Sequence, residues 1–150
     1  MSEQENISIV KQMSEHENVE MVKRGYAAFA RGDMQTLLNL FSDDVEFRHP
    51  MSTAIWPWAG NRRGRAQIAG FFAGLAEVEE FEQFEAREFI AQGNKVVALV
   101  FERFRIKATG RVVDNDYVHV YTLSESKVVQ LCIYEDTAPI IAAIRDQGAI

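Results

Sequence analysis

The sequence predicts an α+β fold, in which helices of the first half of the chain cover one face of a curved antiparallel sheet. Residues 84–135 predict the sheet, because they are rich in β-branched and aromatic residues and are divided by turn signals into consecutive strands. The turn signals lie at residues 93–94, 109–110 and 124–126. Long strands curl because sheets twist, so the concave side of such a sheet must be filled or covered.

Helical periodicity before and after the sheet predicts the covering elements. Ser14 followed by Glu17 fits a capping box at the start of a helix, and Gly32 ends that helix. We therefore expect a flexible N-terminal arm over residues 1–13 and a single domain over residues 14–150. The apolar residues at helical spacing are Val19, Val22, Tyr26 and Phe29, then Ile68, Phe71, Phe72 and Leu75, and finally Ile140, Ile141 and Ile144.

Composition limits the classes of protein and partner. The chain has 150 residues, enough for one domain with a sizeable core, and its formal net charge of -6 argues against nucleic acid as a main partner. No segment approaches the roughly 18 consecutive apolar residues of a membrane span, and the acidic N-terminus is unlike a secretory signal. We therefore expect a cytoplasmic protein without nucleic-acid or membrane partners. Cys132 is the single cysteine and lies in a predicted strand, which indicates a packed thiol.

The sequence contains no motif for a cofactor or a metal. A glycine-rich phosphate loop and a nucleophile elbow are both absent, and the three histidines, His16, His49 and His119, lack metal-ligand spacing. The sequence therefore favours catalysis without a cofactor, or ligand binding without catalysis.

His49 is the first candidate for chemistry. It shares one face of a short predicted strand with Val45 and Phe47, and Pro50 ends that strand. One interpretation is a half-buried histidine that hydrogen-bonds a neighbour. The other is a general acid or base at the wall of a pocket, because imidazole titrates near neutral pH. Both interpretations remain open.

The predicted loop over residues 51–63 adds two tryptophans, Trp56 and Trp58, which either pack down as a plug or line a pocket mouth. The basic cluster at residues 62–65 is either a solvated loop or a site for an anionic ligand.

A third open question concerns the strand over residues 111–123, because both of its faces carry apolar or aromatic side chains. One face predicts a core, and the other predicts a partner surface or a second face covered by the chain's own helices. The two faces comprise Asp116, Val118 and Val120 on one side and Tyr117, His119 and Tyr121 on the other.

Several short motifs occur in a specific order: Arg-Gly-Asp-Met at 31–34, Leu-Leu-Asn-Leu-Phe-Ser-Asp-Asp-Val at 37–45, His-Pro at 49–50 and Tyr-Glu-Asp-Thr at 134–137. With a third helix and a four-strand meander between the last two, the chain resembles the SnoaL-like family of the ketosteroid isomerase and nuclear transport factor 2 superfamily. The resemblance implies a cystatin-like α+β barrel, a cone-shaped antiparallel or mixed sheet wrapped around N-terminal helices with a pocket inside. It also implies a homodimer through the outer face of the sheet, where Tyr117, His119 and Tyr121 are then expected.

The resemblance also implies positions for catalytic residues. The position of the isomerase base, just before a proline, corresponds to His49. The tyrosine position corresponds to Gly25, with Tyr26 one residue later, and the second acid position corresponds to Val118, with Asp116 two residues earlier on the same face. The isomerase set is therefore not preserved, and the pair that could face one cavity is His49 and Asp116.

These observations lead to two main functional hypotheses and one structural alternative. The first is cofactor-independent acid–base catalysis, of isomerase, cyclase or lyase type, on a small hydrophobic carbonyl compound. In it His49 removes a proton next to the carbonyl and a protonated Asp116 hydrogen-bonds the enolate oxygen. The second is a dimeric protein that binds a small apolar ligand without catalysis, and the third is a structural dimer whose cone is filled by its own side chains. The expected ligand-binding residues are Tyr26, Phe29, Phe47, Trp56, Trp58, Phe72 and Val118.

Overall fold

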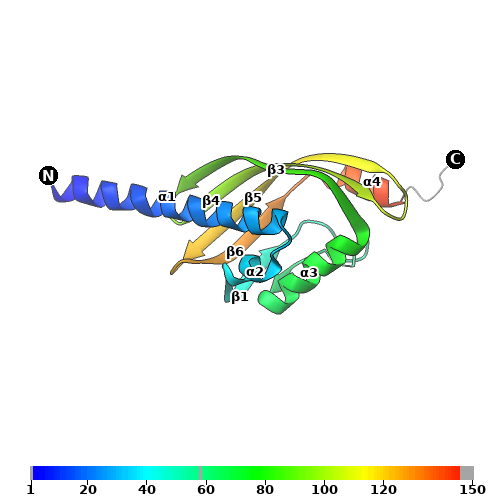
Figure 1. The fold of residues 1–150 in the computed structure, drawn as a ribbon, viewed down its shortest axis with the longest axis horizontal. Coiled ribbons are helices and arrows are strands. Elements are labelled where there is room, and N and C mark those ends of the chain that lie inside the picture. Colours follow the sequence, from blue (N-terminus) through cyan, green and yellow to red (C-terminus); the bar gives the residue numbers. More distant parts are fainter. Residues whose placement is uncertain (1, 58, 146–150) are drawn as a thin grey trace.

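A curved, six-stranded mixed sheet forms the body of the molecule (Figure 1). The structure is a computed structural model that describes residues 2–57 and 59–145. The strands are β1 (Phe41–Arg48), β2 (Arg62–Arg63), β3 (Glu79–Gln92), β4 (Lys95–Ile106), β5 (Val112–Ser124) and β6 (Lys127–Tyr134). The helices are α1 (Glu3–Ala30), α2 (Met34–Asn39), α3 (Arg65–Val78) and α4 (Ala138–Arg145).

The order of strands in the sheet is β2-β1-β6-β5-β4-β3, so β2 and β3 are its edges and the sheet is not closed into a barrel. Strands β3 to β6 form the predicted antiparallel meander, and β1 joins it by pairing parallel to β6. The α+β class and the curved, mixed sheet are therefore confirmed. The hairpin turns also lie where the sequence predicts them, with left-handed backbone at Gly93 (φ 60°) and Gly110 (φ 74°).

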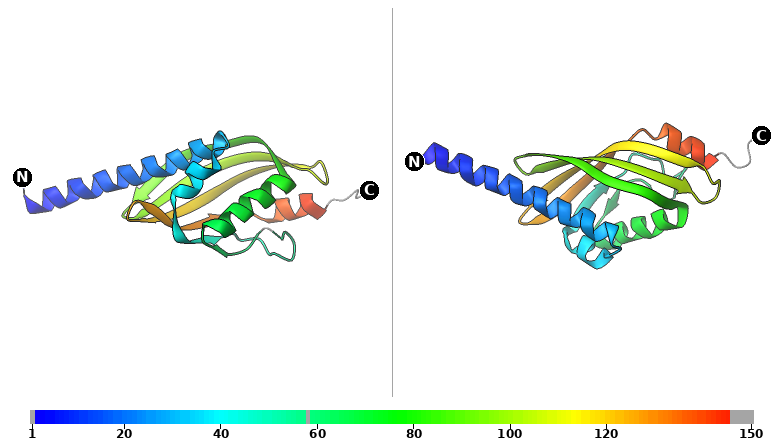
Figure 2. Two further views of the ribbon diagram at one scale, coloured as in Figure 1. Left: turned by 60° about the horizontal axis from the view of Figure 1, so that its bottom comes forward. Right: turned by 45° about the horizontal axis from the view of Figure 1, so that its top comes forward.

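Helices α1, α2 and α3 cover one face of the sheet, as expected (Figure 2). Helix α1 crosses that face in contact with β3 and β4, and α3 packs against β1 and β3. The face under these helices carries the largest fully buried side chains, which include Val45 and Phe47 of β1 and Phe104 of β4. None of the helices in the described part of the chain combines the length and the apolar character that a membrane span requires.

Helix α1 begins earlier than the sequence predicts. Its capping box is formed by Ser2 and Glu5, not by Ser14, so the predicted start at Ser14 is wrong. The extra turns were missed because they have no apolar stripe: the side chains of residues 2–7 are exposed, with Ile7 at 55%. The N-terminal half of α1 extends past the sheet (Figure 1). Whether residues 1–13 move as an arm stays a prediction.

The two faces of β5 are assigned opposite to the expectation. Tyr117, His119 and Tyr121 are buried under the helices, and the alternate residues point outward. The side chain of Asp116 is 84% exposed and lies 3.9 Å from Arg87 on the outer face. The prediction that the aromatic side chains lie on the outer face is therefore wrong, as is the placement of Asp116 and Val118 in the cavity. The reason is that the hydroxyl groups of Tyr26 and Tyr121 and the ring of His119 form hydrogen bonds with one another, so these polar groups can be buried under the helices.

Candidate active site

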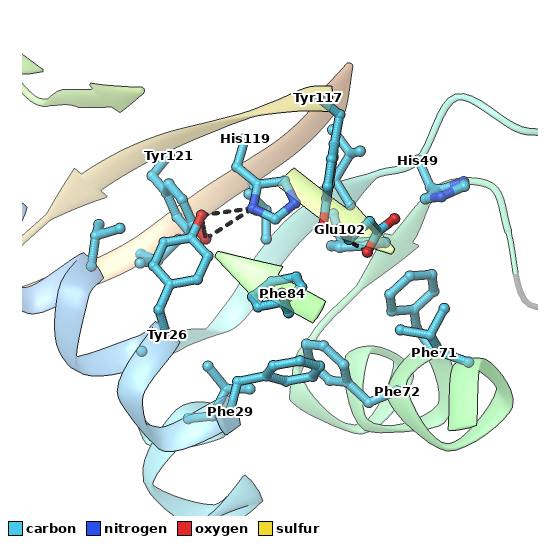
Figure 3. A pocket seen from close by; sticks show the side chains of 18 of the residues that line it. Tyr26, Phe29, His49, Phe71, Phe72, Phe84, Glu102, Tyr117, His119 and Tyr121 are labelled. Carbon is cyan, nitrogen blue, oxygen red and sulfur yellow. Dashed lines mark hydrogen bonds between the residues drawn. The ribbon is translucent and has the colours of Figure 1, made fainter. Parts of the chain in front are cut away.

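A cavity of about 100 Å³ lies between the covered face of the sheet and helices α1, α2 and α3 (Figure 3). It is smaller than the roughly 150 Å³ cavity that accepts a benzene molecule, so a bound organic compound of that size or larger requires the lining side chains to move. The cone is therefore not filled by its own side chains. The aromatic residues that line the cavity are Tyr26, Phe29, Phe41, Phe47, Trp56, Phe71, Phe72, Phe81, Phe84, Tyr117 and Tyr121.

Three glutamates, Glu79, Glu102 and Glu135, line the same cavity and form what we call the carboxyl cluster. Glu79 is the first residue of β3, Glu102 lies in the middle of β4, and Glu135 follows β6. Glu79 and Glu102 are each only 6% exposed. Among the described residues that line the cavity, none is a lysine or an arginine. The cluster is therefore a buried acidic group without a lysine or arginine partner in the described cavity wall.

Hydrogen bonds within the carboxyl cluster distinguish its members. The side-chain amide of Asn115 donates to Oε2 of Glu135 over 2.9 Å and to Oε1 of Glu102 over 3.3 Å. The hydroxyl of Tyr117 donates to Oε2 of Glu102 over 3.1 Å. No described residue donates a hydrogen bond to Glu79. The carboxyl of Glu79 is therefore the one that remains available to a bound molecule.

His49 holds Glu135 in place. Nε2 of His49 lies 3.1 Å from Oε1 of Glu135. The backbone N–H of Met51 donates to Nδ1 of His49 over 3.3 Å, so Nδ1 is the acceptor and the proton of the neutral ring is on Nε2. Both ring nitrogens are thus engaged. His49 lines the cavity as predicted, and its contacts favour the interpretation of a buried histidine that orients a neighbour.

The environment of the carboxyl cluster raises the pKa values of two of its members. Burial raises the pKa of Glu79 to about 9, and the charges of Glu102 and Glu135 act in the same direction. Burial also raises the pKa of Glu102 to about 7, against the opposing effect of the hydrogen bonds from Asn115 and Tyr117. Near neutral pH Glu79 is therefore protonated, and Glu102 is present in both its protonated and its ionised form.

A second polar group lies elsewhere on the cavity wall and is formed by Tyr26, His119 and Tyr121 (Figure 3). The hydroxyl of Tyr26 lies 2.7 Å from Nδ1 of His119, and the hydroxyl of Tyr121 donates to that of Tyr26 over 2.8 Å. Burial lowers the pKa of His119 to about 3, so its imidazole is neutral at physiological pH. Burial raises the pKa values of Tyr26 and Tyr121, which keeps both hydroxyls protonated.

The structure brings most of the predicted site residues to the cavity but not the predicted pair. Asp116 lies on the outer face of the sheet, so the His49–Asp116 pair is wrong, and Val118 lies on that outer face too. Trp58 lies outside the described residues. The predicted residues that do line the cavity are Tyr26, Phe29, Phe47, His49, Trp56 and Phe72.

The carboxyl cluster and the buried face of β5 were missed as site residues. Glu102 alternates with Phe104, but apolar residues occupy both faces of that strand, so its alternation alone does not show which face is inward. Glu79 lies in an acidic stretch of the sequence, a composition that is typical of a solvated surface. Glu135 belongs to the Tyr-Glu-Asp-Thr motif at 134–137, which was a usable signal.

The arginines of the basic cluster at residues 62–65 form ion pairs with carboxylates of β1 at the protein surface. Arg63 pairs with Glu46 over 2.6 Å, and Arg65 pairs with Asp43 over 2.9 Å. These contacts tie the start of α3 to β1 and favour the solvated-loop interpretation. Within the described residues, no group of three or more His, Cys, Asp or Glu side chains has an arrangement that could hold a metal ion.

Comparison with known proteins identifies the class to which this fold and cavity belong. A model of the SnoaL-like domain matches residues 22–131, so the chain belongs to the SnoaL-like family. A crystal structure of a protein like nuclear transport factor 2, from Burkholderia xenovorans LB400, is 37% identical, covers 89% of this chain and 99% of that chain, and has a TM-score of 0.80.

Two further relatives extend this comparison. TerC, co-crystallised with polyporic acid, is 27% identical over 86% of this chain and 98% of its own, with a TM-score of 0.75. An uncharacterized protein of Mycobacterium tuberculosis (strain ATCC 25618 / H37Rv) is 26% identical over 84% of this chain and 95% of its own.

Proposed function

We propose that this protein is an enzyme that transfers protons on a small, largely apolar carbonyl compound without a cofactor. The observation that carries the proposal is the presence of Glu79 and Glu102, with raised and different pKa values, in the wall of one aromatic cavity. Pairs of acids whose environments separate their pKa values are typical of general acid–base catalysis. This proposal replaces the His49–Asp116 pair by residues that line the cavity together.

Glu102 is the proposed base. Its pKa of about 7 is close to the working pH, where a base is both ionised and strong enough to accept a proton. It takes a proton from the carbon next to the carbonyl, the C–H bond breaks, and the electron pair moves onto the carbonyl oxygen. Glu79, protonated and without an internal hydrogen-bond donor, is the proposed acid that supplies a proton to the new position. The sum of these steps is a proton shift that consumes no oxidant or reductant.

Glu135 and His49 are proposed to adjust the pKa values of Glu79 and Glu102 without taking part in the proton transfer. The charge of Glu135 raises the pKa values of both Glu79 and Glu102. The close contact with His49 and the hydrogen bond from Asn115 hold that charge at a fixed position. The ring of His49 in turn packs against Trp56 and Phe71, with centroids 5.4 and 5.5 Å away.

The cavity also favours a class of ligand. Its walls are aromatic, and its described lining contains acidic side chains but no lysine or arginine, which favours a neutral molecule over an anion. The co-crystallisation of TerC with polyporic acid supports a small-molecule ligand for a relative of this fold. Binding of a small apolar compound without catalysis is the second candidate, and the aromatic walls support it equally. Pairing through the outer face of the sheet and a cytoplasmic location stay predictions.

The experiment that tests the proposal follows the exchange of α-protons for deuterium. Two neutral probes, 2-indanone and 2-tetralone, are incubated in D₂O with the protein, and loss of the α-proton signal is measured by NMR. We expect the wild-type protein and an Asp116→Asn control to accelerate exchange equally, because Asp116 lies on the outer face. Glu102→Gln should lose about 100- to 10,000-fold of the acceleration. If Glu102→Gln exchanges as fast as the control, or if the wild type binds both ketones without exchange, the catalytic proposal is wrong.

A further inference from the structure

His119 has two ring edges in different environments. It lies in β5 and is only 7% exposed. Its Nδ1 edge faces the hydroxyls of Tyr26 and Tyr121, at 2.7 and 3.5 Å. The other edge, which carries Nε2, points to the side of the cavity where Tyr117 and Glu102 lie (Figure 3). No described residue forms a hydrogen bond with Nε2. A polar atom that faces a cavity from a buried side chain, and that has no hydrogen-bond partner among the described residues, indicates a position for a ligand atom.

The two tyrosines determine which nitrogen of His119 carries the proton. Because the Tyr121 hydroxyl donates to the oxygen of Tyr26, the proton of Tyr26 is directed to Nδ1 of His119. An imidazole that accepts at Nδ1 carries its hydrogen on Nε2. The raised pKa values of both tyrosines and the lowered pKa of His119 keep this chain of hydrogen bonds in one protonation state over the physiological range.

Aromatic contacts fix the orientation of the ring as well. The rings of Tyr117 and Tyr121 meet that of His119 edge-on, at interplanar angles of 84° and 86°. The ring of Tyr26 lies parallel to it, with an interplanar angle of 3°. The donor direction of Nε2 is therefore set before a ligand arrives, and such preorganised donors are the ones that stabilise charge developing on an oxygen.

We propose that Nε2–H of His119 donates a hydrogen bond to the carbonyl oxygen of the substrate, and that Tyr26 and Tyr121 are positioning residues that fix this tautomer. This inference rests on the proposed function, which places the abstracted proton on Glu102 and leaves the developing enolate oxygen without an assigned donor. The substrate is thus a neutral ketone or its enol whose oxygen points to β5 while its α-carbon points to the carboxyl cluster.

The test is the ¹⁵N NMR spectrum of histidine-labelled protein, with the His119 signals assigned from their loss in His119→Gln. In the wild type we expect a protonated Nε2 and an unprotonated Nδ1, and a shift of the Nε2–H signal on saturation with 2-tetralone. Tyr26→Phe removes the donor to Nδ1 and should allow a mixture of tautomers, whereas Tyr134→Phe, which changes a 60% exposed tyrosine, should not. His119→Gln should lower α-proton exchange about 100- to 1,000-fold, as expected for one oxyanion donor.

The outcomes separate this inference from the proposed function. A proton on Nδ1, or an Nε2 signal that does not move when 2-tetralone saturates the protein, overturns the role of His119 even if exchange is catalysed. A shifted Nε2 signal without catalysed exchange retains His119 as the ligand-binding donor and rejects the catalytic proposal. The wild-type spectra decide the tautomer even if a variant fails to fold.

Discussion

Nε2 of His49 lies 3.1 Å from Oε1 of Glu135, and the two side chains are 4% and 5% exposed. This contact joins the residue that follows β1 to the residue that follows β6, and it sits in the wall of the cavity. Because the backbone N–H of Met51 donates to Nδ1 of His49, Nε2 is the ring nitrogen that carries the proton, and it faces Glu135. The contact favours a role for His49 in orienting Glu135.

The stability of His49 variants tests this relationship. We expect His49→Leu to lower the free energy of unfolding at pH 7 by about 1–3 kcal/mol relative to His49→Gln. The reason is that a glutamine amide can still donate to the buried carboxylate, whereas leucine leaves it without that donor. Urea denaturation monitored by tryptophan fluorescence measures the difference. Equal stability of the two variants would show that the contact between His49 and Glu135 does not stabilise the folded protein.

The raised pKa of Glu79 predicts how stability depends on pH. The folded protein holds a proton to about pH 9 on a group whose ordinary pKa is 4.5, so unfolding releases that proton at any pH between these values. The stabilising contribution of the protonated form is therefore complete below about pH 4.5 and is lost as the pH rises towards 9. Each titrating group adds a slope of about 1.4 kcal/mol per pH unit.

Glu79→Gln removes this titration, so its free energy of unfolding should fall less steeply with pH than that of the wild type. Urea denaturation at pH 5.5 and pH 8.5 compares the two slopes. Glu88→Gln, at an exposed position of the same strand, is the matched control and should follow the wild type. Parallel curves for the wild type and Glu79→Gln would mean that Glu79 is ionised in the folded protein at neutral pH.

The composition of the cavity wall predicts selectivity for charge. A neutral aromatic probe, 2-naphthol, should raise the melting temperature, and at 100 times its Kd it should add about 2.7 kcal/mol to the free energy of unfolding. The carboxylate of similar size, 2-naphthoate, should have little effect at pH 8, because the carboxyl cluster repels it and no lysine or arginine of the described lining offsets its charge. Differential scanning calorimetry with both probes checks this, and tighter binding of the anion would contradict it.

The exposed start of α1 predicts that residues 2–13 contribute little to the stability of the domain. The described side chains of residues 2–7 and 9 are exposed, and among the described side chains of the helix Glu15 is the first with a tertiary hydrogen bond, which it accepts from the backbone of Gly93. Deletion of residues 2–13 should therefore change the free energy of unfolding by less than about 1 kcal/mol. A larger loss in urea denaturation would assign a structural role to the predicted arm.

The features that were predicted correctly are those that depend on residues close together in the sequence. The hairpin turns at Gly93 and Gly110 follow from the backbone freedom of glycine, and the meander follows from them. The inward direction of His49 follows from two apolar residues on the same face of a short strand that Pro50 ends. These signals need no knowledge of which elements pack together.

The features that were missed depend on contacts between distant elements. Both faces of β5 carry apolar side chains, and the hydrogen bonds of Tyr26, in α1, with His119 and Tyr121 mark the face that is inside. Tyr26 lies 93 residues before His119 in the chain, so their hydrogen bond cannot be found from local spacing. Glu79 lies among acidic residues, which is typical of a solvated position, but α3 runs directly into β3 and places it in the cavity.

The pH dependence of α-proton exchange on 2-tetralone tests the central claim most directly. If Glu102 is the base and Glu79 the acid, the catalysed rate should rise as the pH increases through about 7, where Glu102 loses its proton, and fall above about 9, where Glu79 loses its own. Glu102→Gln should lower the catalysed rate about 100- to 10,000-fold, and Glu79→Gln should lower it at every pH because glutamine cannot supply a proton. A catalysed rate that is independent of pH between 5 and 10, or a Glu102→Gln variant with the wild-type profile, would contradict the account.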